Sequence, residues 1–189
     1  SKAESLVAKY YGSSNIKEML SSLSKKIKES DSSIPLLVDS ANKGIGEVFL
    51  EIALLFKTIP AGYDYAQMYM AISEYFNPDN DITKIAMADI FEERQMYKDA
   101  NKYYDSVSKK SEMFYPAQIK KANNLSEEKQ YDAAVKVLKK LLRDNPKNFQ
   151  VLFNLGDVLR INNQQSDAIK YYNEAINSIF YESEKYWPV

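Results

Sequence analysis

The stretch YDAAVKVL at residues 131–138 decides the fold, because its pattern occurs three times in the chain. The corresponding stretches are YKDANKYY at residues 97–104 and QSDAIKYY at residues 165–172. Their central alanines, Ala100, Ala134 and Ala168, stand 34 residues apart. A fixed period of this length predicts one helix–turn–helix unit that is stacked several times, an architecture whose work is to hold other molecules.

A second set of small residues precedes these stretches with the same period. Ala88, Ala122 and Gly156 would lie in the first helix of each unit and let it approach the second helix closely. Pro146 stands where a second helix has to stop, since proline cannot continue a helix. Large residues fill the flanks of the expected contact: Phe91, Leu125, Leu159, Tyr104, Leu138 and Tyr172.

The combined pattern resembles the tetratricopeptide repeat family over residues 47–182. The resemblance implies an all-α, right-handed α–α superhelix with repeats at 47–80, 81–114, 115–148 and 149–182. It also implies a non-catalytic scaffold for protein–protein interaction. In the first repeat the small residue is Ala53, one position early, which predicts a turn one residue longer around residues 60–62. A weaker resemblance to long alphaproteobacterial tetratricopeptide proteins of undefined role points to a bacterial source.

The residues on either side of the array do not show the 34-residue pattern. Residues 1–45 carry helical spacing and are expected to form a degenerate or capping hairpin at the N-terminal end. Residues 183–189 read as the start of a truncated further repeat or as a tail, so we expect the chain to be a fragment or a processed form. Tyr186 and Trp187 at this edge predict a weak homodimer.

The composition argues against catalysis and against several ligands. The chain of 189 residues has no His and no Cys, which removes the usual general base and the commonest metal ligands. Its glycines fit no phosphate-binding loop, and we expect no cofactor. A net charge of −1 does not favour nucleic acid, and no apolar run is long enough for membrane insertion. The composition fits both the cytoplasm and the periplasm.

In the family that the chain resembles, first helices line a concave groove that binds partner segments. The resemblance places an apolar floor at Ile85, Ile119 and Phe153 beneath Asp89, Asn123 and Asp157. Further groove positions are Glu92, Glu93, Glu127, Asn154 and Arg160. This acidic wall predicts a peptide or protein partner with basic and apolar side chains. The competing interpretation is that the apolar residues pack between helices and the carboxylates form a solvated surface.

Two asparagines bear on the kind of ligand that the groove would bind. Asn123 and Asn154 match the asparagines with which some family members clamp a C-terminal carboxylate, but Ile119 replaces the expected lysine, which argues against that clamp. Two alternatives to the scaffold function follow. The chain would be a non-catalytic region of a larger enzyme or envelope-assembly protein, or it would be a module that self-associates through its open C-terminal edge.

Overall fold

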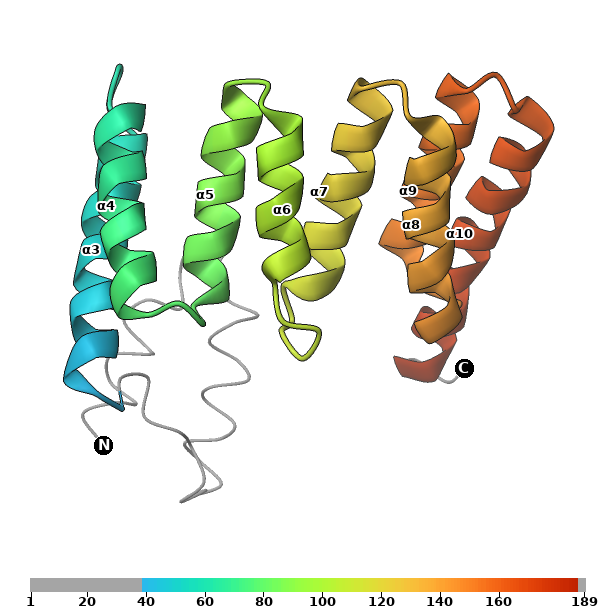
Figure 1. The fold of residues 1–189 in the computed structure, drawn as a ribbon. Helices are drawn as coiled ribbons and strands as arrows, with labels where there is room; N and C mark the ends of the chain where they lie inside the picture. Colours follow the sequence, from blue (N-terminus) through green and yellow to red (C-terminus); the bar gives the residue numbers. More distant parts are fainter. Residues whose placement is uncertain (1–38, 187–189) are drawn as a thin grey trace. The chain divides into compact units, whose positions relative to one another are not determined.

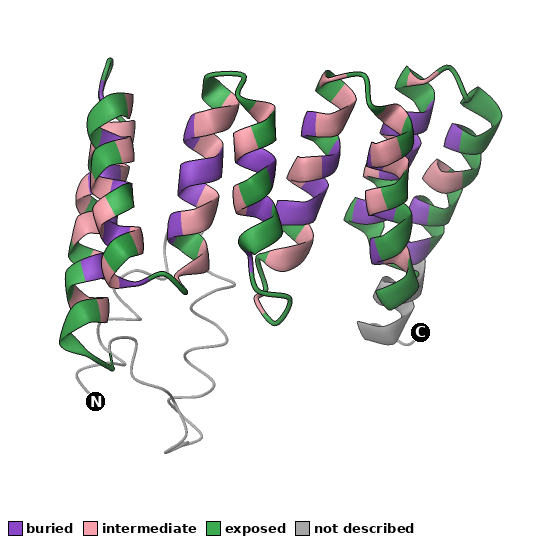
Figure 2. Cartoon of the chain, in the orientation of Figure 1, coloured by how far each residue is buried: buried purple, intermediate pink, exposed green. Residues whose placement is uncertain are grey.

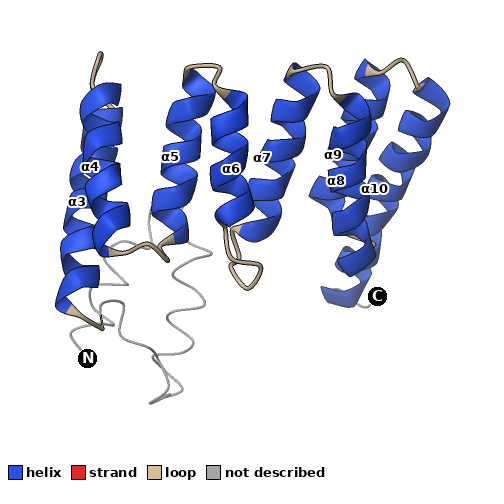
Figure 3. Ribbon diagram, in the orientation of Figure 1, coloured by secondary structure: helices blue, strands red, loops and turns tan. Residues whose placement is uncertain are grey.

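The computed structural model describes residues 39–186, with side chains described up to residue 179. Every regular element in this part of the chain is a helix, which confirms the all-α prediction (Figure 3). The helices are α3 (Ala41–Lys57), α4 (Tyr63–Phe76), α5 (Asp81–Glu93), α6 (Tyr97–Ser106), α7 (Phe114–Glu127), α8 (Tyr131–Asp144), α9 (Phe149–Ile161) and α10 (Gln165–Tyr186).

Within residues 42–186 the eight helices pack pairwise, as in a tetratricopeptide superhelix (Figure 1). The pairs are α3/α4, α5/α6, α7/α8 and α9/α10, and the second helix of each pair packs on the first helix of the next. This confirms the four helical pairs expected from the period. Residues 1–38 of the predicted N-terminal hairpin and residues 187–189 lie outside the described part.

The periodic small residues lie where two helices approach most closely. Ala88, Ala122, Ala100 and Ala134 are fully buried. At Gly156 a Cβ atom would lie 2.6 Å from the ring of Tyr172, so only glycine allows this ring position unchanged. Figure 2 shows buried residues recurring along each helix beside exposed ones, as expected for helices with one apolar face.

The turn inside each pair also repeats, through a conformation that the residue types did not reveal. Ala61, Gln95, Lys129 and Asn163 stand 34 residues apart and all have φ near +60°. After each of the last three, the next backbone N–H donates to a carbonyl five residues back, as Gln130 N does to Leu125 O at 2.8 Å. This is the Schellman ending of a helix, which usually places glycine at the left-handed position.

Two of the three connections between the pairs of the described array are Asn-Pro turns. α4 and α8 end immediately before Asn77 and Asn145, because a residue that precedes proline is disfavoured in the helical conformation. Asn80 and Asn148 then cap the following helices; the side-chain oxygen of Asn80 accepts from Ile82 N at 2.9 Å, and that of Asn148 accepts from Val151 N at 3.0 Å.

Three boundaries differ from the sequence prediction. α3 begins at Ala41 instead of residue 47, and Gly46 inside it is buried where an added Cβ atom would lie 2.7 Å from Cβ of Asn77, at the end of α4. The turn after α3 spans residues 58–62, against 94–96 in the next pair, so it is two residues longer and not one. At the other end, residues 183–186 continue α10 without a turn.

Candidate peptide-binding groove

The first helices of the last three pairs border two adjoining pockets. One, of about 500 Å³, is lined by residues of α5 and α7 that include Glu92, Glu93, Lys120, Asn123 and Glu127. The other, of about 300 Å³, lies between α7 and α9 and is lined by Asn123, Glu127, Asn154, Asp157, Arg160 and Ile161, among others. Asn123 and Glu127 border both pockets, so the two adjoin, and we call them together the inner groove.

Asp89 is held by side chains from three other helices. It accepts from Lys57 Nζ at 2.9 Å, from Lys120 Nζ at 2.7 Å and from the hydroxyl of Tyr104 at 3.2 Å. Burial disfavours the charged carboxylate, yet the two lysines keep the pKa of Asp89 below its ordinary value. Asp89 therefore joins α3, α5, α6 and α7 and has little capacity left for a ligand.

Lys120 joins this cluster to the inner groove. Its ammonium also donates to Glu92 at 3.2 Å, so one lysine neutralises part of two carboxylates. Burial alone would lower the pKa of Lys120, but Asp89 and Glu92 raise it above its ordinary value. Burial and the same two carboxylates raise the pKa of the Tyr104 hydroxyl, which therefore stays protonated and acts as a donor.

The aspartate–tyrosine contact recurs at the same register in the last pair. The hydroxyl of Tyr172 donates to Asp157 at 2.7 Å, and Arg160 lies 3.5 Å from the same carboxylate oxygen. In the intervening pair these two positions are Asn123 and Leu138. Because leucine has no hydroxyl, Asn123 is left exposed to the groove with its amide unpaired among the described residues.

Glu93 and Glu127 are the exposed carboxylates of the inner groove. Both line its larger pocket, and neither makes a hydrogen bond or an ion pair within the described part of the chain. They differ in this from Asp89, Glu92 and Asp157, whose charges already have partners. The negative potential offered to a ligand therefore comes mainly from Glu93 and Glu127.

The predicted apolar floor is not assembled in the inner groove. Ile119 is buried in the core between α7, α8 and α9, and Ile85 is half-buried against the core of α5 and α6. Phe153 is exposed, but it lines a separate apolar pocket between α9 and α10. The placements of Ile85 and Ile119 agree with the competing interpretation, in which the apolar positions pack between helices, whereas that of Phe153 does not.

The remaining predicted residues are brought together. Asn154 lines the smaller pocket, and its amide nitrogen donates to the carbonyl of Gln150 in its own helix. Tyr97 and Ile161 supply apolar lining that the sequence analysis did not include. The repeat register could have identified both residues, because Tyr97 begins the second helix of its pair and Ile161 ends the first helix of its pair. Each therefore lies next to the turn where the two helices of the pair meet.

Two searches of the described residues bear on other functions. No group of three or more carboxylates among the described side chains, residues 39–179, is close enough to hold a metal ion. No helix in the same range has the length and apolar character that crossing a membrane requires.

Comparison with known proteins gives one family and one fold. Residues 119–182 match the model of the tetratricopeptide repeat family. No curated protein sequence matches the chain. A crystal structure of MamA is 12% identical and superposes with a TM-score of 0.61 over 85% of this chain and 86% of that chain.

Two further MamA structures are similar. One, from MSR-1, is 17% identical with a TM-score of 0.57 and covers 76% of this chain and 82% of its own. The other, residues 41 to the end of MamA from Desulfovibrio magneticus RS-1, is 17% identical with a TM-score of 0.58 and covers 75% and 77%. At these identities the likeness shows the fold alone. The tetratricopeptide repeat that residues 119–182 match is typically a protein-interaction module and usually non-catalytic.

Proposed function

This chain is a tetratricopeptide repeat protein, and we propose that it is a non-catalytic scaffold that binds an extended, basic segment of a partner protein in the inner groove. The observation that carries the proposal is the pair of carboxylates of Glu93 and Glu127, which have no partner among the described side chains, beside the exposed amide of Asn123. A carboxylate pair selects lysine or arginine side chains, and an exposed amide can both donate to and accept from a peptide backbone.

The apolar part of the partner would meet Tyr97 and Ile161. Tyr97 borders the pocket between α5 and α7, and Ile161 borders the pocket between α7 and α9. An extended segment that places a basic side chain between two apolar ones would reach both ends of the inner groove. This replaces the floor of Ile85, Ile119 and Phe153 as the source of apolar contact.

Reversing the two free charges tests the proposal. We expect Glu93→Lys/Glu127→Lys to weaken binding of basic peptides from a library by about five- to tenfold, since exposed charge contacts contribute up to about 1 kcal/mol each. Asp89→Lys is unsuitable for this test of binding, because it would place a third cation beside Lys57 and Lys120 and destabilise the fold. Binding should weaken only moderately with added salt, mainly through slower association.

The matched control is Glu112→Lys/Glu174→Lys, which makes the same change in net charge at two exposed positions outside the inner groove. Fluorescence anisotropy should give wild-type affinity for this control. If both double variants lose basic peptides equally, the effect is one of net charge, and the inner groove is not the binding site.

A further inference from the structure

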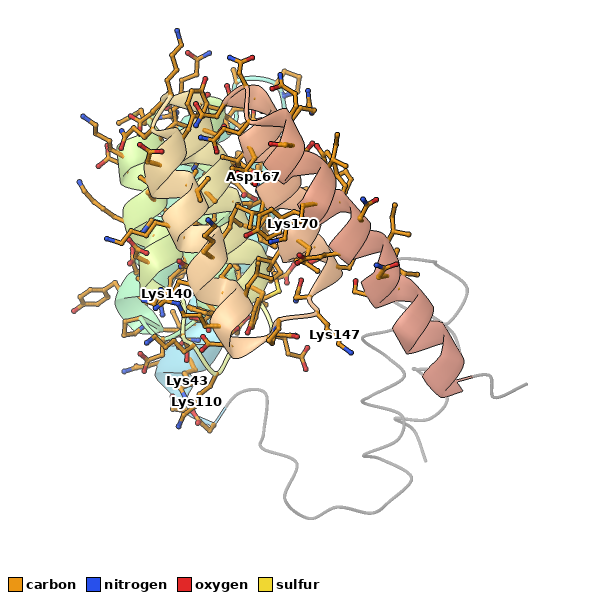
Figure 4. The ribbon with its side chains drawn as sticks, turned by 90° about the vertical axis from the view of Figure 1, so that its right-hand side faces the viewer. Lys43, Lys110, Lys140, Lys147, Asp167 and Lys170 are labelled. Carbon is orange, nitrogen blue, oxygen red and sulfur yellow. The ribbon has the colours of Figure 1, made fainter. Side chains whose placement is uncertain are left out.

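The C-terminal pair carries an apolar groove that is distinct from the inner groove. It has a volume of about 490 Å³ and an almost purely apolar lining, from Phe149, Phe153, Tyr172, Ala175, Ile176 and Ile179. Phe153, Ile176 and Ile179 are 44%, 49% and 47% exposed. Figure 4 looks at the helices from the α10 side, where no described helix lies in front of this edge. We call this surface the acceptor groove.

The preceding pair shows what normally fills such a groove. Residues 119, 138 and 141 stand one period before Phe153, Tyr172 and Ala175. These three residues, Ile119, Leu138 and Leu141, are at most 8% exposed, because α9 packs over them with Val151, Leu155 and Val158. The occupant that fits the acceptor groove is therefore the first helix of a pair, presenting an apolar face.

α3 presents such a face at the other end of the described helices. Its exposed or half-buried apolar residues recur every three or four positions: Ile45, Val48, Ile52 and Leu55. Val48 and Leu55 are 59% and 63% exposed. This spacing puts the side chains on one side of the helix. We call this surface the α3 stripe.

The repeat register identifies the α3 stripe as a docking face. Relative to the buried small residue Ala53, Val48 stands five positions before, Ile52 one position before and Leu55 two positions after. In α9 the same positions relative to Gly156 are Val151, Leu155 and Val158, which pack on the preceding pair. In α5 they are Thr83, Met87 and Ile90; Met87 and Ile90 pack with α3 and α4, and Thr83 bonds Ser73 of α4.

We propose that the α3 stripe of one copy of this chain packs into the acceptor groove of a second copy, head to tail. The two surfaces are the two halves of the contact that joins consecutive pairs inside the chain, so each offers what the other lacks. The interface is heterologous, which leaves a free stripe at one end and a free groove at the other and permits chains of more than two copies. It does not depend on peptide binding in the inner groove.

Two edge variants separate the surfaces. Val48→Glu/Leu55→Glu places charge on the α3 stripe, and Ile176→Glu/Ile179→Glu places it in the acceptor groove. In sedimentation velocity, wild type should form dimers and larger species as concentration rises, whereas each variant alone should stay monomeric. The control is Met68→Glu, at the position that Lys102 and Lys136 occupy in the next pairs, and it should associate like wild type.

Mixing the two variants tests the head-to-tail geometry. The acceptor-groove variant keeps an intact stripe and the stripe variant keeps an intact groove, so an equimolar mixture should give a one-to-one dimer and nothing larger. A wild type that stays monomeric at high micromolar concentration overturns the proposal. A stripe variant that still self-associates, or a mixture that stays monomeric, overturns it as well.

A cross-link gives a second measurement that does not need a destabilising charge. The natural chain has no cysteine, so Val48→Cys and Ile176→Cys each introduce a single thiol. Mixed and mildly oxidised, the two variants should form a covalent dimer faster than either forms one alone. Equal rates in all three samples would show that the stripe and the groove of different copies do not meet.

Discussion

At the residue scale, the chain uses the same positions of successive pairs for different purposes. Asp89 and Asp157 each accept from a tyrosine of the paired helix, while Asn123 has a leucine at the corresponding position and makes no side-chain hydrogen bond within the described residues. Asp89 further binds Lys57 and Lys120, which makes it a structural residue among the groove positions. The same repeat position therefore links the two helices in two pairs, through Asp89 and Asp157, and offers an amide to a ligand in the third, through Asn123.

Removal of the Asp89 charge tests the structural role of this residue. We expect Asp89→Asn to lower the free energy of unfolding at neutral pH by about 1–3 kcal/mol, since it leaves two lysines without their shared partner. The folded pKa lies below 3.8, so the contribution is complete above that pH and is lost as pH falls through the lower folded value. Urea unfolding at a series of pH values should show the gap to wild type shrinking below about pH 4.

The control for this substitution is Asp105→Asn. Asp105 pairs with Lys121 at 2.6 Å, but the carboxylate is largely exposed, so the change should cost at most about 1 kcal/mol. A gap between Asp89→Asn and wild type that is the same at acidic and neutral pH would contradict the assigned role of the carboxylate.

The left-handed turn residues give a second prediction at this scale. Lys129 has φ of 60°, a conformation that costs L-residues about 1–2 kcal/mol, whereas glycine adopts it readily. After the entropy cost of glycine, Lys129→Gly should stabilise the chain by about 0.5–1 kcal/mol. Lys136→Gly, inside α8, should instead destabilise it by about 1 kcal/mol. Thermal or urea unfolding that ranks the two variants the other way would refute the Schellman assignment.

At the scale of the helices, close packing depends on small residues, and polar side chains fill the places that lack apolar ones. Gln118 is buried where the family pattern usually has a large residue, and its amide donates to the carbonyl of Tyr104 at 3.0 Å. Asn124 of α7 likewise donates to Asn101 of α6 at 3.1 Å. These bonds satisfy groups that would otherwise be costly to bury, so the contact between α6 and α7 tolerates its polar residues.

Enlarging one small residue tests the packing between α7 and α8. Ala134 is fully buried in the core that also contains Ala122. Ala134→Leu should lower the free energy of unfolding by about 1–3 kcal/mol, because the added bulk separates the two helices. Lys136→Ala, on the exposed face of α8, should change it by no more than about 0.5 kcal/mol. An unfolding midpoint equal to wild type for Ala134→Leu would show that the register is wrong.

At the scale of the described array, the core is divided along the chain. One cluster joins α3, α4 and α5, a second joins α5, α6 and α7, and a third joins α7, α8, α9 and α10. Each helical pair contacts mainly its neighbours, so stability is expected to be local, as in other repeat proteins. A substitution in one cluster should loosen that part of the array more than the rest.

Hydrogen exchange measures this locality. Leu138→Ala, which removes a fully buried side chain from the third cluster, should cost about 2–5 kcal/mol and reduce amide protection chiefly in α7, α8 and α9. Met70→Ala in the first cluster should reduce it chiefly in α3, α4 and α5. An equal loss of protection in all helices for both variants would mean that the array unfolds as a single unit.

The amino-acid sequence by itself determined the class of fold and the pairing of helices. The 34-residue period and the small residues Ala88, Ala122, Ala100 and Ala134 were sufficient, because close approach of two helices leaves a mark at fixed sequence positions. It did not reveal the left-handed residues at the turns, since Ala61, Gln95 and Lys129 are residue types that rarely adopt this conformation, and only Asn163 is of a type that tolerates it. There the hydrogen bonds of the helix end impose the conformation.

Only the tertiary structure decided which groove positions are available to a ligand. Asp89 is engaged because Lys57 and Lys120 reach it from α3 and α7, and Ile119 is buried because α9 covers it. Phe153 has the same register as Ile119 but is exposed, since no described helix follows α10 in the array. The partners of a polar side chain depend on residues one or more repeats away, and the period identifies which helices pair but not which of these side chains meet.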